Sequence, residues 1–340
     1  MVLDLTQFLP GPMLTRLMAD EGARVVKIEP PGGDPAATME PFEAGQSFWY
    51  RNVNRGKEVV RLDLKTPEGA RHLHELIAQA DVLVEGFRPG VMARLGFAAA
   101  EVRRRHPRLV WCSISAFGQT GPLAHHPAHD LGAWALSGFL SLNDGPDGTP
   151  AVPGLPASDM AAGLTALSAI LMALLARERT GAGATIDVAM LDCLLPWGAH
   201  LLGETVVDGR PVRSAHQRSL GGHALYQVYR TRDDRFVVLC GREAKFARNL
   251  LEALGRPDLV PLAEAPAGPA HAPLIRFLAD TFATRTQAEW VEWFKDRDVA
   301  FAPVLDTAQA LAQPVVAERG LVVADEGAHV LRSPIRFLAD

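Results

Sequence analysis

Short apolar runs alternate with amphipathic stretches through the first half of the chain. Runs rich in β-branched residues indicate buried strands at 2–5, 25–29, 58–64, 81–87 and 109–117. Helical patterns lie between them, at 12–21, from Thr66-Pro67-Glu68 to residue 80, and around the basic stretch 102–105. Connections of this length between strands predict a parallel sheet with helices on both faces. We therefore expect an α/β fold with a Rossmann-like large domain.

The pattern changes beyond residue 155. Ser158 and Asp159 are expected to cap a long apolar helix that ends at Gly181, before a strand at 184–190. A polar, weakly periodic stretch follows, and two alternating runs around Asp233-Asp234 then predict a hairpin at 224–231 and 235–240. Further helical patterns lie at 243–254, 273–282 and 287–295. The predicted organisation is a large domain at 1–190 and 305–340, a linker at 191–222, and a smaller α+β domain with its return linker at 223–304.

Composition and charge narrow the class of protein. The 340 residues are 48% hydrophobic, and 34 Lys and Arg against 39 Asp and Glu give a net charge of −5. This composition is typical of a folded protein and predicts no nucleic-acid binding, which needs a basic surplus on at least one face. The longest apolar run, 164–176, is interrupted by Thr165 and Ser168, so we expect no membrane span. Three widely spaced cysteines and an N-terminus without a basic signal predict a cytoplasmic protein without disulfides.

Several common chemistries lack their sequence signatures. The first turn reads Leu9-Pro10-Gly11-Pro12, without the glycines that let a backbone approach a dinucleotide pyrophosphate. The chain has no Gly-x-Ser-x-Gly motif of a serine hydrolase. His125, His126 and His129 share a loop, but no Cys or acidic cluster with ligand spacing accompanies them, so we expect no metal site.

Three residues at element boundaries are candidates for acid–base chemistry. His129 precedes Asp130 after a loop that leaves the carboxyl end of a predicted parallel strand, the side where such sheets bind ligands. Asp159 opens the next helix, and Glu243 follows a strand of the smaller domain. Structural roles are the alternatives: an N-cap for Asp159, a partly buried hydrogen-bonding group for His129, and a first-turn acid that complements the helix dipole for Glu243.

An ordered set of short motifs resembles the family III CoA-transferase superfamily over nearly the whole chain. The motifs are Pro10-Gly11-Pro12, the stretch 17–29, Asn54-Arg55-Gly56-Lys57, Val84 to Gly90, Gly118-Gln119-Thr120-Gly121-Pro122, Thr180 to Gly183, Asp187 to Met190, and Pro334-Ile335-Arg336-Phe337. The resemblance implies a Rossmann-like large domain built from both chain ends, a small domain, and an interlocked homodimer in which Glu243 reaches the site from the partner subunit. It also implies an acyl-CoA substrate and no separate cofactor.

Within that superfamily the sequence is similar to the α-methylacyl-CoA racemase branch, because His129 stands where the transferases usually carry Tyr. The implied reaction inverts the α-carbon of a 2-methyl-branched acyl-CoA. A racemase needs two acid–base groups flanking that carbon, and the resemblance assigns His129 and Asp159, with Glu243 supporting the His. Backbone N–H groups at Asp130 would stabilise the enolate oxygen. The residues implied for CoA phosphates are Lys65, Arg88 and Arg94, with Lys27 and Arg55 as further candidates.

Two other functions stay open from the sequence. In a CoA-transferase, Asp159 would be the nucleophile that forms acyl-anhydride and thioester intermediates. A catalytically silent CoA-binding or dimeric scaffold protein is the third possibility, although His129, Asp159 and Glu243 together argue against it.

Overall fold

The computed structural model describes residues 1–145, 147–325 and 327–338. Within this range the chain forms two compact units. Unit 1 contains Met1–Phe139, Val152–Trp197 and the stretch from Pro314, and unit 2 contains Leu140–Ala151 and Gly198–Gln313. Residues 339 and 340, the end of the predicted large domain, lie outside the described residues.

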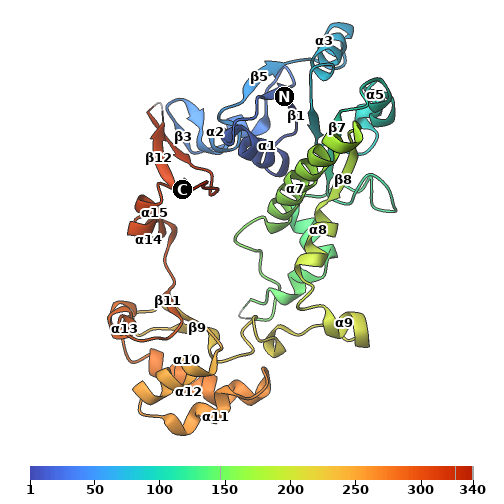
Figure 1. The fold of residues 1–340 in the computed structure, drawn as a ribbon. Helices are drawn as coiled ribbons and strands as arrows, with labels where there is room; N and C mark the ends of the chain where they lie inside the picture. The colour runs from blue at the N-terminus through green and yellow to red at the C-terminus, as the bar shows by residue number, and fades with distance from the viewer. Residues whose placement is uncertain (146, 326, 339–340) are drawn as a thin grey trace. The chain divides into compact units, whose positions relative to one another are not determined.

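The sheet of unit 1 has six parallel strands in the order β5-β2-β1-β6-β7-β8 (Figure 1). Val2 of β1 lies beside Val25 of β2 on one side and Val82 of β6 on the other. The predicted parallel sheet is confirmed, and its strand order reverses between β1 and β6. The strands are β1 Val2–Leu5, β2 Val25–Glu29, β5 Glu58–Arg61, β6 Val82–Glu85, β7 Val110–Ser115 and β8 Thr185–Ala189.

Helices cover both faces of this sheet, which explains why its central strands are nearly continuous apolar runs. One core joins the sheet to α1 Pro10–Asp20, α7 Ala157–Thr180 and α8 Met190–Trp197. The opposite core joins it to α3 Pro67–Ile77, α4 Val91–Arg94 and α5 Ala99–Arg105. Figure 1 shows α7 running along β7 and β8, which it contacts. The two predicted layers of helices are therefore present.

Local sequence signals set several helix ends. The Thr66 hydroxyl accepts a hydrogen bond from the Gly69 N–H at 3.1 Å and caps α3, as its Thr-Pro-Glu start predicts. At the other end of α7, Gly181 takes a left-handed φ of 73°, which ends the helix where the sequence predicts.

The chain returns to unit 1 after unit 2. The β12–β13 hairpin, Val322–Asp325 and Ala328–Leu331, packs against α2, Phe48–Asn54. There the Leu331 N–H donates to Asn52 at 2.6 Å, and the Arg16 guanidinium donates to the Leu331 carbonyl at 2.9 Å. The remaining elements of unit 1 are β3 Phe42–Glu43, β4 Gln46–Ser47, α6 Asp130–Leu136, α15 Pro314–Glu318 and a 3-10 helix at Pro35–Thr38.

Unit 2 is built on an antiparallel sheet in the order β11-β10-β9. The helices between residues 244 and 294 pack around a core that includes Phe282, Trp290 and Phe294. The predicted hairpin is present as β9 and β10. The strands are β9 Tyr226–Arg230, β10 Phe236–Cys240 and β11 Phe301–Pro303, and the helices are α9 Gly203–Asp208, α10 Ala244–Ala253, α11 Val260–Ala263, α12 Ala272–Phe282, α13 Gln287–Phe294 and α14 Thr307–Leu311.

The stretch 191–222 is more structured than the predicted linker. It contains most of α8, all of α9 and a 3-10 helix at Ser214–His216. These helical segments are too short to show helical periodicity in the sequence, and Gly209 ends α9 at a φ of 68°.

In the part of the chain that the structure describes, α7 alone is long and apolar enough, by length and composition, to cross a membrane. Thr165 and Ser168 interrupt its apolar run without making the helix polar. In the structure α7 packs on the sheet through Ala161, Ala166 and Ile170. The absence of membrane contact stays a prediction.

Candidate active site

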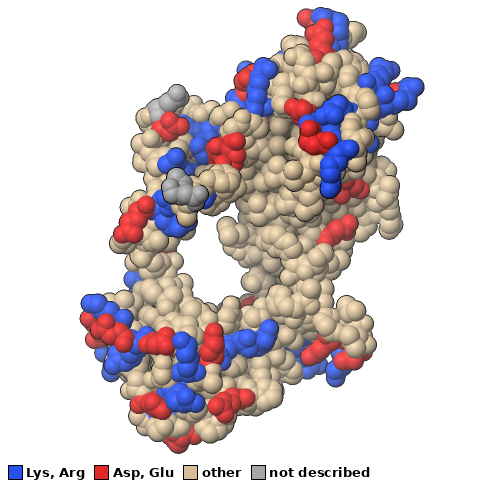
Figure 2. Space-filling view, in the orientation of Figure 1, with Lys and Arg blue, Asp and Glu red and all other residues tan. Residues whose placement is uncertain are grey.

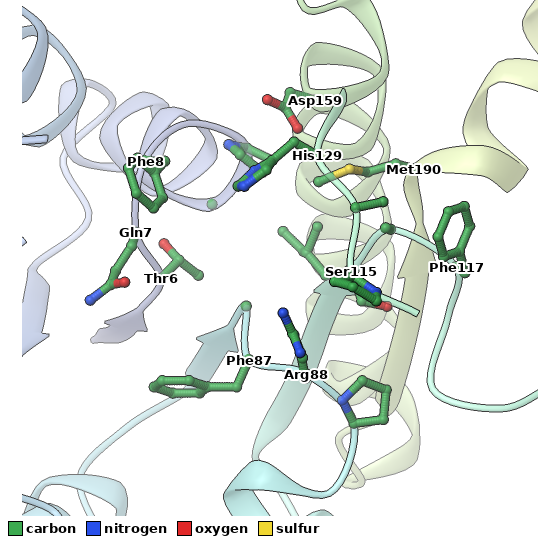
Figure 3. A pocket seen from close by; sticks show the side chains of 18 of the residues that line it. Thr6, Gln7, Phe8, Phe87, Arg88, Ser115, Phe117, His129, Asp159 and Met190 are labelled. Atoms are coloured by element: carbon green, nitrogen blue, oxygen red, sulfur yellow. The ribbon is translucent and has the colours of Figure 1, made fainter. Parts of the chain in front are cut away.

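A pocket of about 350 Å³ opens at the carboxyl ends of β1, β6 and β7. The loops after β1 and β6 form its walls, so it lies where the strand order reverses, the usual ligand position in doubly wound sheets. Figure 3 shows Asp159 and His129 at one end of the pocket and Arg88 reaching in from the opposite wall. The side chains labelled there are Thr6, Gln7, Phe8, Phe87, Arg88, Ser115, Phe117, His129, Asp159 and Met190.

Asp159 lies in the first turn of α7 and does not cap it. The helix begins at Ala157, and the Asp130 carboxylate satisfies its free N–H groups instead, at 2.7 Å from Ser158 N and 3.1 Å from Asp159 N. The predicted capping role of Ser158 and Asp159 is therefore wrong, because a carboxylate from another helix takes it. The Asp159 side chain is left to face the pocket.

Burial, and to a smaller extent the nearby negative charge of Asp130, raises the pKa of Asp159 to about 7. Near neutral pH both protonation states of this carboxyl are populated. A group with this pKa accepts and donates protons efficiently at physiological pH.

His129 is the residue before α6, and its imidazole does not cap that helix. Its ring lies edge-on to the ring of Phe8, with centroids 6.3 Å apart and an interplanar angle of 85°. Among the described residues, no protein group hydrogen-bonds its ring nitrogens. The structure therefore does not support the alternative of a hydrogen-bonded interior histidine and brings His129 and Asp159 to the same pocket.

Asp130 has a role that the sequence did not suggest. Its side chain holds the start of α7, as described above, while α6 begins at its backbone. The predicted use of its N–H toward an enolate oxygen stays a prediction.

Glu243 lies in unit 2, directly before α10, and its side chain makes no cap hydrogen bond. It borders a shallow depression with Tyr226, Cys240 and Arg242. Its expected position in the first helical turn is off by one residue. Its predicted support of His129 from a partner subunit stays a prediction.

Three of the five predicted CoA-binding residues lie on the accessible surface at the pocket side of the sheet. Arg88 is exposed and lines the pocket. Lys65 borders an adjoining apolar slot of about 150 Å³, which shares Leu5, Gln7 and Phe87 with the pocket. Arg94 is exposed at the end of α4, next to Leu95 of the same slot.

Lys27 and Arg55 do not fit this role. The Lys27 side chain is 0% exposed, and its ammonium donates to the Thr6 carbonyl at 2.8 Å and pairs with Asp34 at 2.9 Å. Arg55 pairs with Asp20 at 2.9 Å and lies near the β12–β13 hairpin. Because internal carboxylates already use both charges, we leave these two residues out of the candidate CoA site.

The sequence reasoning missed several residues of the pocket wall, among them Gln7, Phe8 and Ser115. Gln7 and Phe8 follow the first predicted strand directly, so the rule that ligands bind at strand carboxyl ends could have found them. Among the described residues there is no group of three His, Cys, Asp or Glu side chains that could hold a metal ion.

A doubly wound sheet with a carboxylic acid and a histidine in a pocket where the strand order reverses is typical of an α/β enzyme. The sequence matches the family described as CoA-transferase family III over residues 1–339, and the chain belongs to this family.

Two curated relatives and one solved structure illustrate this membership. The chain is 38% identical to an acetyl-CoA:oxalate CoA-transferase of Acetobacter aceti over 99% of this chain and 88% of the relative. It is 31% identical to the human α-methylacyl-CoA racemase over 99% of this chain and 85% of the relative. A CAIB/BAIF family protein from Brucella suis has the same fold, with a TM-score of 0.85 at 29% identity over 99% of this chain and 91% of that one.

Proposed function

We propose that this enzyme inverts the α-carbon of a 2-methyl-branched acyl-CoA by proton transfer between Asp159 and His129. The observation that carries the proposal is the joint presence of these two side chains in one pocket, together with the pKa of about 7 for Asp159. A two-base reaction requires one group that is deprotonated while the other, on the opposite face of the α-carbon, is protonated.

The reaction follows from these roles. The Asp159 carboxylate accepts the α-proton, and the electron pair of the broken C–H bond moves into the thioester to form an enolate. The His129 imidazolium then donates its proton to the opposite face of the α-carbon. In the reverse direction the two protonation states are exchanged. Both proton transfers use side chains of the protein, so we propose that no separate cofactor takes part.

The shape of the site suits an acyl-CoA. The pocket and the apolar slot have Gln7 and Phe87 in common in their walls, and we propose that one elongated molecule extends from the pocket to the slot. We propose that the thioester lies at His129 and Asp159 and the adenine in the slot. Arg88, Lys65 and Arg94 would then lie along the phosphates, where cations contribute charge-assisted hydrogen bonds.

CoA transfer to a carboxylate is the second candidate, because the Acetobacter aceti relative at 38% identity carries a transferase name. In that reaction Asp159 attacks the thioester as a carboxylate nucleophile. A pKa of about 7 leaves only part of this carboxyl ionised at neutral pH, which suits a nucleophile less well than an acid–base group.

Deuterium exchange distinguishes the two reactions. The enzyme is incubated in D₂O with the 2R or the 2S ester of a 2-methylacyl-CoA, without any carboxylic acid acceptor, and proton NMR follows the α-position. We expect exchange and inversion of both esters. No exchange, together with CoA transfer to added oxalate, would establish the transferase instead, and neither activity would favour a silent CoA-binding protein.

We also propose that two copies of the chain associate. Several apolar side chains of α7 point to solvent, namely Leu164, Leu171, Met172 and Leu175. Figure 2 shows few charges over the N-terminal part of this helix. Light scattering on a size-exclusion column is expected to give the mass of a dimer, and Met172→Glu with Leu175→Glu is expected to give the mass of the 36.7 kDa chain.

A further inference from the structure

Phe8 holds a backbone conformation that bulky side chains rarely adopt. Its φ angle is 64°, in the left-handed region. The other described non-glycine residues with positive φ are Ala44 and Asp234, which lie in the turns of the β3–β4 and β9–β10 hairpins. Such angles are common in hairpin turns. Phe8 instead lies between β1 and α1, in the wall of the pocket.

Buried charges fix the chain before Phe8. The Thr6 N–H donates to the Asp4 carboxylate at 2.9 Å, and the Lys27 ammonium donates to the Thr6 carbonyl at 2.8 Å. Asp4 is itself paired with Lys57 at 2.9 Å, and both of these side chains are 0% exposed. Thr6 therefore has little freedom to move.

Close packing fixes the chain after Phe8. A Cβ atom on Gly11 would lie 2.3 Å from the side chain of Thr6, so only glycine lets α1 begin this close to the end of β1. The Met13 N–H donates to the Leu9 carbonyl at 2.9 Å and starts the helix. With both flanks fixed, the positive φ falls on Phe8. Strain of this kind persists where surrounding contacts over-determine it, and it is concentrated at functional sites.

The strained backbone directs the Phe8 ring toward His129. Figure 3 shows Phe8 and His129 on the same side of the pocket, and their rings make the edge-on contact at 6.3 Å. Trp49 is a second aromatic neighbour of Phe8, with ring centroids 6.4 Å apart. No described protein group hydrogen-bonds the imidazole, and the Phe8 ring is the aromatic group that contacts it.

We propose that Phe8 is a positioning residue for His129, an inference that rests on the proposed two-base function. The ring keeps the imidazole turned toward the α-carbon. Asp159 is held separately by α7 and by the Asp130 carboxylate, so it does not depend on Phe8. Loss of the ring should therefore impair the proton transfer by His129 and spare the transfer by Asp159.

The kinetic test uses Phe8→Leu, which keeps most of the apolar volume, and Phe8→Tyr, which keeps the ring. His129→Gln and Asp159→Asn first identify which ester, 2R or 2S, depends on each base. We expect Phe8→Leu to lower kcat for exchange of the His129-dependent ester by about 10- to 100-fold with little change in KM, since small misplacements of a reacting group have effects of this size. Exchange of the other ester should stay close to wild type, and Phe8→Tyr should restore most of the loss. Phe8→Met replaces Phe8→Leu if the latter does not fold.

Two controls make the result decisive. Asp234→Gly relieves a positive φ in the β9–β10 turn and should leave both exchange rates unchanged. Histidine ring resonances of the free enzyme, assigned with His129→Gln, should show a ring-current shift for His129 that Phe8→Leu removes. Equal loss for both esters, or an unchanged His129 resonance, would overturn the positioning role. If the wild-type enzyme exchanges neither ester, the two-base function fails, and the resonance alone decides whether Phe8 positions His129.

Discussion

The two units differ in what they bury. Unit 1 encloses two ion pairs close to the end of β1, Asp4 with Lys57 and Lys27 with Asp34, and all four side chains are 0% exposed. Unit 2 encloses stacked aromatic rings instead, such as Phe294 on Phe301 with centroids 3.9 Å apart.

Buried ion pairs and buried aromatic rings contribute differently to a fold. Buried ion pairs contribute little net stability because desolvation offsets their attraction, but they define geometry through directional hydrogen bonds. In unit 1 they fix the end of β1, and so the pocket wall. Aromatic packing in unit 2 stabilises mainly through the large apolar area that each ring buries. The stability of unit 1 should therefore be sensitive to substitutions that change a buried charge, and the stability of unit 2 to substitutions that change the volume of a core side chain.

The largest expected effect is on catalysis, from Asp159→Asn. Loss of one acid–base group should lower the exchange rate about 10²- to 10⁴-fold. The counterpart in unit 2 is Asp306→Ala, which removes a carboxylate that caps α14 by accepting from Gln309 N at 2.8 Å. It should cost about 1 kcal/mol of stability and leave the rate unchanged. A rate loss in Asp306→Ala comparable to that in Asp159→Asn would contradict the assignment of catalysis to the carboxylate in unit 1.

The same Asp159 variant should also stabilise the fold at high pH. The folded pKa of about 7 exceeds the ordinary value of 3.8. The wild-type carboxyl therefore does not destabilise the fold below about pH 4, where it is protonated in both the folded and the unfolded state. The destabilisation grows between pH 4 and 7 and is complete above pH 7. Asp159→Asn should accordingly melt at a higher temperature than the wild type at pH 8, with the gain disappearing near pH 4.

The next largest effect concerns stability, in the matched pair Asp4→Asn and Trp290→Ala. The first removes the charged partner of the buried Lys57, while Lys27 keeps Asp34, and it should cost about 3–5 kcal/mol. The second empties a core position that is 1% exposed and should cost a similar amount, about 3–5 kcal/mol. Urea unfolding at neutral pH should therefore give comparable losses.

Acid distinguishes the two variants. Burial would raise the pKa of Asp4, but Lys57, Lys27 and the hydroxyls of Thr15 and Thr6 together hold it well below its ordinary value. The stability from Asp4 is thus present above about pH 4 and is lost as the pH falls further. The cost of Asp4→Asn should shrink below pH 4, and that of Trp290→Ala should not. Parallel pH curves for the two variants would argue against the contrast between the units.

A smaller effect is expected on substrate binding from Arg88→Ala. A hydrogen bond to a charged group contributes about 1.5–3 kcal/mol, so KM for the CoA ester should rise about 10- to 100-fold with kcat nearly unchanged. Arg256→Ala in unit 2, which breaks a surface ion pair with Asp258, is the control and should change neither constant. An unchanged KM in Arg88→Ala would remove this residue from the site.

The smallest effect is a shift in the pH profile from Asp130→Asn. The amide oxygen can still accept from the N–H groups at the start of α7, but the charge that raises the pKa of Asp159 is gone. The acidic limb of the kcat/KM profile should move to lower pH. A limb that stays in place, with α7 intact by circular dichroism, would show that burial alone sets this pKa.

Much of unit 1 could be predicted because local and tertiary signals agree there. The apolar runs at 2–5 and 25–29 became β1 and β2 with the predicted bounds. The short α9 was missed because six residues carry too little periodicity. Lys27 was assigned to CoA by resemblance, yet a lysine inside the run Val-Val-Lys-Ile-Glu of a strand buried on both faces is itself a signal of an internal ion pair.

The candidate site could be predicted only in part from the sequence. His129 and Asp159 are 30 residues apart, and resemblance rather than pattern suggested their pairing. The capping of α7 by Asp130 depends on two helices meeting in space, which spacing does not reveal. The positive φ of Phe8 results from restraints on both of its flanks and has no signature in its own neighbourhood of the sequence.

The position of β1 has a consequence for the order in which the protein is built on the ribosome. β1 is synthesised before the other strands, yet it lies inside the sheet, with β6 as one of its two neighbours. One of its edges therefore stays unpaired until β6 has emerged, and unpaired edges invite non-native association. The fold of unit 1 is also incomplete until the β12–β13 hairpin has been synthesised, and this hairpin follows all of unit 2 in the chain. The unit that begins first is thus completed last, and chaperones that shield strand edges should associate with the nascent chain early.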